Sequence, residues 1–119
     1  MVSKHDQLRK RAHQFAVQIV QLFRTLPKTE EARIIGRQLL RSATSVAANY
    51  RAAGRSRSQA EFVSKMGIVV EEADETMFWL ELLGDTQVLT REALSDLSRE
   101  SGELLAIFAA SYHTTKNNR

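Results

Sequence analysis

The chain has 119 residues, which fits a single domain with a hydrophobic core of its own. It contains no cysteine, which excludes disulfides and thiolate metal sites, and its net charge of +3 permits nucleic-acid binding without establishing it. No N-terminal stretch resembles a signal peptide, and no run of 18 apolar residues could span a membrane, so we expect a cytoplasmic protein.

The first half of the chain predicts two helices. Apolar residues recur at steps of three and four over residues 3–26, and Pro27 ends this segment because the residue before a proline avoids α geometry. The second helix covers about residues 29–53, with Thr29 as its N-cap and Gly54 as its C-terminal stop.

The second half predicts two more helices. Ser58 and Glu61 have the spacing of a capping box and open a helix over residues 58–84. The fourth helix starts near Thr90 and covers about residues 90–113.

Short turns between four helices of similar length favour antiparallel neighbours. The predicted fold is therefore all-α, an up-down-up-down antiparallel four-helix bundle, with residues 1–119 as one domain. The polar residues 114–119 are expected to fray.

Several apolar side chains remain outside the predicted core stripes. At about 100° per residue, the third helix places four of them well away from its core-facing side, and the second helix has a similar seam with small residues. Exposed apolar clusters of this kind usually mark an interface, although Trp79 could instead flank the core. The residues expected at a subunit interface are Ile34, Ala48, Ile68, Phe78, Trp79 and Leu82.

Asn49 falls inside the predicted core stripe of the second helix. A buried amide needs hydrogen-bond partners, so we expect it to be buried, bonded and structural, fixing how the second and third helices pack.

The carboxylates Glu71, Glu72 and Glu75 raise the question of a metal site. None of the three histidines forms the Glu-x-x-His pairs of di-iron bundles, and pairing with Arg37 or Arg41 is the simpler expectation. No phosphate-binding loop or catalytic triad is evident. The sequence therefore predicts no catalytic residues, no metal, no cofactor and no enzymatic activity.

Charge is unevenly distributed along the predicted bundle. The pole formed by the starts of helices one and three and the ends of helices two and four holds ten cationic residues against Asp6 and Glu61. Its net charge is +8, whereas the rest of the chain has −5. These cations are Lys4, Arg9, Lys10, Arg11, Arg51, Arg55, Arg57, Lys65, Lys116 and Arg119. Such a pole suits phosphate backbones, although solubility alone would also explain it.

Three runs of the sequence carry a family resemblance. The run Arg41-Ser42-Ala43-Thr44-Ser45-Val46-Ala47-Ala48-Asn49-Tyr50 resembles a signature segment of the four-helix bundle proteins known as 23S rRNA intervening-sequence proteins. The downstream runs Glu71-Glu72-Ala73-Asp74-Glu75-Thr76 and Phe78-Trp79-Leu80-Glu81-Leu82-Leu83 extend the similarity, which is most specific over residues 38–83.

The resemblance implies a bacterial protein, commonly a homopentamer in which five bundles surround a channel. The family also includes the accessory variability determinant of diversity-generating retroelements, which is basic and associates with nucleic acid and a reverse transcriptase. Most members have no established biochemical function.

Two functions remain open. The first is a homo-oligomer that binds RNA or DNA non-specifically through its basic pole, by means of Arg9, Lys10, Arg11, Arg51, Arg55, Arg57 and Lys65. The second is a scaffold or assembly protein that binds another protein.

Overall fold

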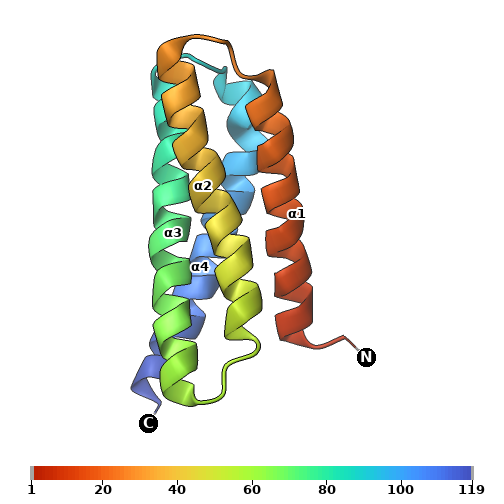
Figure 1. Ribbon diagram of the computed structural model, residues 1–119, viewed down its shortest axis with the longest axis vertical. Helices are drawn as coiled ribbons and strands as arrows, with labels where there is room; N and C mark the ends of the chain where they lie inside the picture. The colour runs from red at the N-terminus through yellow and green to blue at the C-terminus, as the bar shows by residue number, and fades with distance from the viewer. Residues whose placement is uncertain (1, 119) are drawn as a thin grey trace.

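The computed structural model describes residues 2–118 and contains four helices and no strand within that range. They are α1 (Lys4–Thr25), α2 (Glu30–Ala53), α3 (Gln59–Asp85) and α4 (Arg91–Asn117), arranged as an elongated bundle of 47 × 28 × 19 Å (Figure 1). The predicted all-α bundle is confirmed, and no helix among these residues is both long and apolar enough to cross a membrane.

Each helix begins at a hydroxyl side chain that caps its first turn. Ser3, Thr29, Ser58 and Thr90 each accept a hydrogen bond from the backbone N–H three residues ahead, at 3.0 to 3.3 Å. These bonds satisfy N–H groups that have no partner inside the helix. The predicted starts are therefore correct to within one residue.

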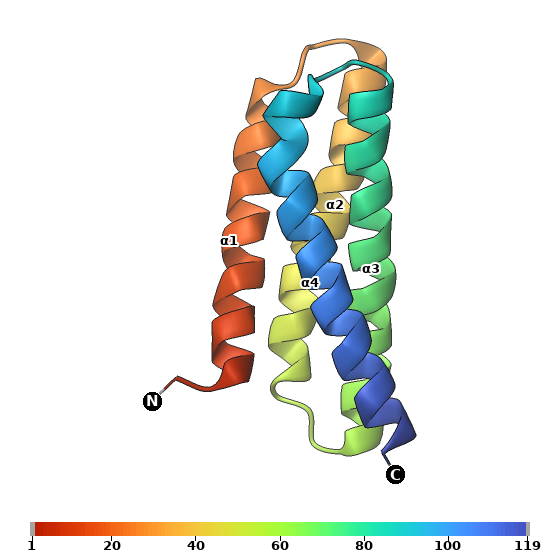
Figure 2. The same ribbon diagram turned by 180° about the vertical axis from the view of Figure 1, so that it is seen from behind.

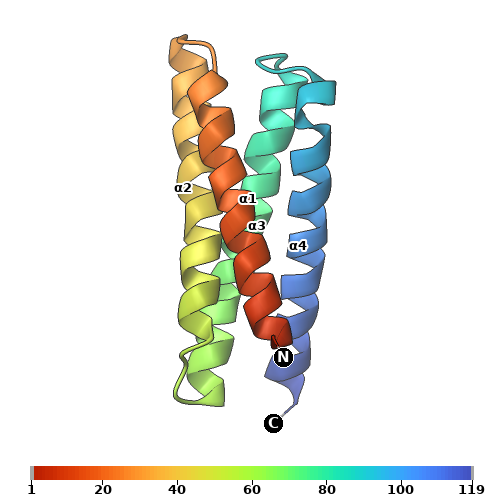
Figure 3. The same cartoon turned by 90° about the vertical axis from the view of Figure 1, so that its right-hand side faces the viewer.

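The helices run up, down, up and down. The start of α1, the α2–α3 turn and the end of α4 lie at one end of the bundle, and the other two turns lie at the opposite end (Figures 1 and 2). α2 and α3 pack along most of their length, whereas α1 and α4 approach each other over the shortest stretch (Figure 3). This topology is the one that the predicted basic pole requires.

A single core fills the centre of the bundle. Its largest fully buried apolar side chains, drawn from all four helices, are Ile19, Leu39, Met66, Leu80, Leu83, Leu104 and Phe108. Gly36 is buried at the α1–α2 end, where Phe23 and Leu26 occupy the space that a β-carbon would need. It thus allows close packing within the protomer.

The end of α4 differs from the prediction. The helix continues to Asn117 instead of ending near residue 113. The side-chain amide of Gln59, at the start of α3, donates to the carbonyls of Thr115 and Asn118 at 2.9 and 3.0 Å. These bonds satisfy carbonyls that a free helix end would leave to water, so the last turn does not fray.

The prediction for Asn49 was wrong in two respects. The side chain is half-buried, and its amide donates to the carbonyl and hydroxyl oxygens of Ser45 in its own helix, at 2.9 and 3.0 Å. The buried polar contact between α2 and α3 is made instead by Ser42 and Thr76, whose hydroxyl oxygens lie 2.9 Å apart. Both hydroxyls also reach carbonyls in their own helices, so this contact leaves no unpaired group.

Candidate interaction surfaces

A groove runs between the first half of α1 and the second half of α2. It encloses about 660 Å³, and we call it the basic groove; its lining residues are Arg9, Lys10, His13, Gln14, Ala16, Thr44, Ala47, Ala48 and Arg51. Small side chains form much of its α2 wall, and cationic side chains come from both helices. His13 and Thr44 were not among the predicted residues, although His13 lies three residues from Lys10 and Thr44 lies seven from Arg51.

A second hollow adjoins the groove at the basic pole. This end hollow encloses about 390 Å³ and is lined by His5, Asp6, Arg9, Arg51, Gly54 and Arg55. Arg9 and Arg51 line both spaces, so the basic groove and the end hollow form one continuous basic surface.

The cations of this surface are largely uncompensated. Arg51 and Arg55 are exposed, and among residues 2–118 no carboxylate forms an ion pair with either of them or with Lys10. Arg9 is the exception, with its Nε 3.8 Å from Asp6, a long and half-exposed contact. Exposed pairs of this kind add little stability, which leaves the guanidinium groups available to a ligand.

His5 forms one wall of the end hollow. Its imidazole stacks on the ring of Tyr50, with 4.4 Å between centroids, and Tyr50 packs on Phe108. Gly54 lies so close to this imidazole that a β-carbon there would overlap it. Burial lowers the pKa of His5, with a smaller opposing effect from Asp6, and burial raises the pKa of Tyr50.

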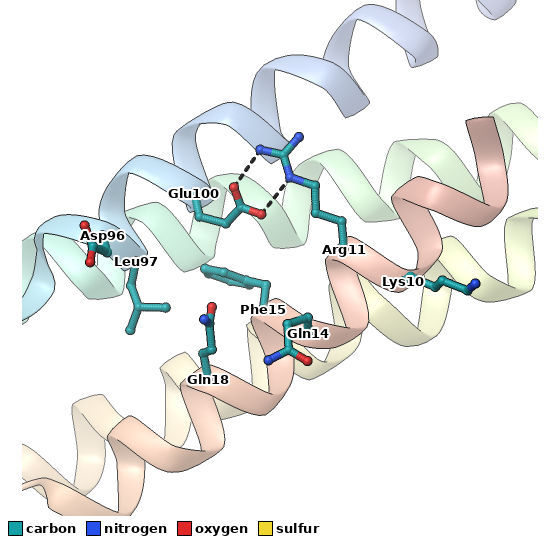
Figure 4. A pocket seen from close by; sticks show the side chains of 8 residues that line it. All are labelled: Lys10, Arg11, Gln14, Phe15, Gln18, Asp96, Leu97 and Glu100. Atoms are coloured by element: carbon teal, nitrogen blue, oxygen red, sulfur yellow. Dashed lines mark hydrogen bonds and ion pairs between the residues drawn. The ribbon is translucent and has the colours of Figure 1, made fainter. Parts of the chain in front are cut away.

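Arg11 does not belong to this surface, contrary to the prediction. It points to the other side of α1, where its guanidinium forms a bidentate salt bridge with Glu100, with N···O distances of 2.6 and 2.7 Å (Figure 4). It also reaches Glu103 at 2.9 Å, and these carboxylates raise its pKa further above the usual value. Lys10, one residue earlier, points away from this pair. Glu100 and Glu103 of α4 therefore compensate Arg11, although the prediction opposed the pole's cations with Asp6 and Glu61 alone.

Four other predicted cations also lie outside both hollows. Arg57 is exposed in the α2–α3 turn, and Lys65 is half-buried on α3. Lys4 and Lys116 are exposed at the same end of the bundle, and Arg119 falls outside the described residues.

The predicted apolar surface gathers around an ion-pair network between α2 and α3. Arg41 pairs with Glu72 at 3.2 Å and with Glu75, and the indole N–H of Trp79 donates to Glu75 at 3.1 Å. The guanidinium lowers the pKa of Glu75 and the carboxylates raise that of Arg41. The predicted pairing of the acidic run with Arg41 is therefore confirmed for Glu72 and Glu75.

Apolar side chains surround this network and form what we call the outer patch: Ile34, Ile68, Phe78, Trp79 and Leu82. Ile34 is 54% exposed, Ile68 39% and Phe78 52%, whereas Trp79 and Leu82 are half-buried against the core. Ile34 lies seven residues from Arg41, and Ile68 and Leu82 lie seven from Glu75, so these side chains share the network's side of their helices. The rings of Phe78 and Trp79 meet edge to face with centroids 4.9 Å apart.

Ala48, the remaining residue predicted at a subunit interface, lies at the border between the outer patch and the basic groove, seven residues from Arg41. It is exposed, but it lines the basic groove beside Arg51. A helical wheel of α2 alone does not show that Ala48 faces a groove, because the wheel does not include α1.

The family model for 23S rRNA-intervening sequence proteins matches residues 4–110. The chain belongs to this family. A crystal structure of a protein of unknown function from the S23 ribosomal protein family of Bacteroides thetaiotaomicron is 35% identical, with a TM-score of 0.82 over 88% of this chain and 97% of that one. No curated protein matches the chain. The resemblance drawn from residues 38–83 is thus confirmed, and the family itself has no established activity.

Proposed function

We propose that this protein binds the phosphate backbone of nucleic acid through the basic groove and the end hollow. The supporting observation is the convergence of Arg9, Lys10, Arg51 and Arg55 on two adjoining hollows in which Asp6 is the one carboxylate among the lining residues. Concave, cationic surfaces with low-dielectric walls concentrate polyanions.

The binding is expected to be independent of sequence. Neither hollow is lined by a Phe, Tyr or Trp side chain for stacking bases, because Tyr50 is buried beneath His5. Contacts to phosphate position a nucleic acid but do not read its sequence.

A salt series with single-stranded RNA and duplex DNA tests the proposal. Affinity should fall linearly on a logarithmic plot, with a slope of about −0.7 per phosphate contacted on a single strand. The variant Arg51→Glu/Arg55→Glu/Arg57→Glu should lose retention while keeping its helicity. The matched control is Lys28→Glu/Arg33→Glu/Arg37→Glu, which makes the same change in charge at exposed positions of the opposite end. Equal loss in both variants, or no binding by the wild type at low salt, would contradict the proposal.

A second function is self-association, or scaffolding, through the outer patch. Ile34, Ile68 and Phe78 leave apolar surface in water around Trp79, and such surface is typical of protein interfaces. We expect a homo-oligomer, with the pentamer common in this family as the expected size. Light scattering that reports only the 13.5 kDa protomer at micromolar concentration would contradict it.

A further inference from the structure

The two hollows are not independent, because Arg9 and Arg51 form the boundary between them. Each hollow then adds one cation of its own. Of these two spaces, Lys10 lines the basic groove and not the end hollow, and Arg55 lines the end hollow and not the basic groove. With histidines neutral, the groove has three positive charges, and the end hollow has three positive charges and Asp6.

The length of the shared surface limits what it can bind. Its α2 wall runs from Thr44 to Gly54, which at 1.5 Å per residue is about 15 Å. That is less than half of the roughly 34 Å turn of a DNA duplex. The surface is also recessed between two helices, so a chain must bend into it to reach both hollows.

We infer that the basic groove and the end hollow form a two-phosphate site, in which Arg9 and Arg51 bridge adjacent phosphates of one flexible chain. This inference rests on the proposed function and specifies its ligand. Lys10 completes the contact to the phosphate in the groove, and Arg55 completes the contact to the phosphate in the end hollow.

The chemistry of the two shared residues fits this role. A guanidinium carries five N–H donors in a planar fork, so one arginine can donate to two anions at once, whereas a lysine acts as a point charge. The arginines stand at the boundary and the lysine stands on one side of it. Asp6 disfavours the end hollow for an isolated phosphate, and a phosphate already tethered in the groove overcomes this repulsion through its high effective concentration.

The ligand class is therefore a flexible chain of adjacent phosphates. Single-stranded nucleic acid and inorganic polyphosphate share this chemistry. A rigid duplex presents its phosphates on a convex surface and cannot place two of them in recessed, adjoining hollows.

Calorimetry with thymidine monophosphate and with thymidylate chains of increasing phosphate number tests the site. Affinity should rise by about ten-fold or more from one phosphate to two, because the second contact is intramolecular. The salt slope should change from about −0.7 to about −1.4 over the same step. Inorganic polyphosphate of matched phosphate number identifies which source of chain binds more tightly, and a matched duplex should bind no better than the monophosphate.

Three variants locate the contacts. Arg51→Gln should abolish the rise in affinity from one phosphate to two, because it removes hydrogen-bond donors from both hollows. Lys10→Gln should weaken the monophosphate and the longer chains alike. The control Arg37→Gln, an equal change of charge at an exposed position of the same helix, should leave the step intact.

The outcomes separate this inference from the proposed function. Long single strands that bind with steep salt dependence, but with affinity growing smoothly from one phosphate upward, would overturn the two-phosphate site alone. A duplex bound as tightly as the single strand would do the same. Absence of binding by long strands at low salt would remove both.

Discussion

The basic groove and the outer patch both include residues of α2, but among the described residues the α2 arginine of the groove is unpaired and the α2 arginine of the patch is paired. In the groove, Arg51 contacts no carboxylate among residues 2–118, whereas in the patch Arg41 is paired with Glu72 and Glu75. The groove is hollow and its cations face water, while the patch presents apolar side chains around a neutralised centre. Unpaired charge in a recess suits a charged ligand, and paired charge within apolar surface suits a protein partner.

The largest effect is expected from Phe78→Glu in the outer patch. A carboxylate at this half-exposed ring would be desolvated in any interface that covers the patch, so assembly should be lost while the bundle remains folded. Light scattering with circular dichroism measures both properties. Ala106→Glu, at an exposed position of α4, is the matched control and should assemble normally. Equal masses for the two variants would mean that the outer patch does not take part in assembly.

Arg41→Gln should reduce the stability of the protomer by about 0.5–1 kcal/mol, because its ion pairs are partly exposed. The folded-state pKa of Glu75 lies below its unfolded value, so its stabilisation is present near neutral pH and is lost as pH falls through the acidic range. Urea unfolding of wild type and variant at several pH values measures this. A stability difference that persists unchanged in acid would mean that the guanidinium contributes by packing.

Protonation of His5 is expected to give the stability of the protein a smaller dependence on pH. Its folded-state pKa is lowered, so the unfolded chain binds its proton more readily and stability should decrease as pH falls below about 6.5. Asp6 opposes this effect and Arg9 strengthens it. His5→Asn should remove this component of the pH dependence in thermal melts. His13→Asn, at an exposed position, is the control that should leave it in place.

Asn49→Leu should have the smallest effect, within about 0.5 kcal/mol. The variant loses the hydrogen bonds to Ser45, but leucine has the higher helix propensity and the position is only half-buried. Thermal melts measure the difference. A loss of several degrees would restore the role in helix packing that the sequence had suggested.

The features that could be predicted from sequence are those that depend on local chemistry. Thr29 and Ser58 cap helices through bonds to residues three ahead, and the core faces follow from helical spacing. The meeting of Arg51 with Arg9 of α1 followed from the predicted topology.

Contacts between distant segments were not predictable in this way. Gln59 donates a hydrogen bond to the end of α4 although the two segments are 56 residues apart in sequence. The ion pair between Arg11 and Glu100 depends on how α1 and α4 pack against each other. Ser42 and Asn49 lie seven residues apart on the same side of α2, and the packing of α3 along that side determines which of them is buried. Side-chain packing sets how each helix is rotated about its own axis. A sequence pattern predicts which face is buried, but it does not distinguish between neighbouring positions on that face.

Trp79 is the chain's one tryptophan, and its indole lies in the outer patch beside Phe78. Tryptophan fluorescence, excited selectively over the two tyrosines, therefore comes from this surface and not from the basic groove. A partner that covers the patch would shift the emission to shorter wavelength, whereas an oligonucleotide in the groove would leave it unchanged. Unlabelled protein can thus report, in one titration, which of its two surfaces a ligand occupies.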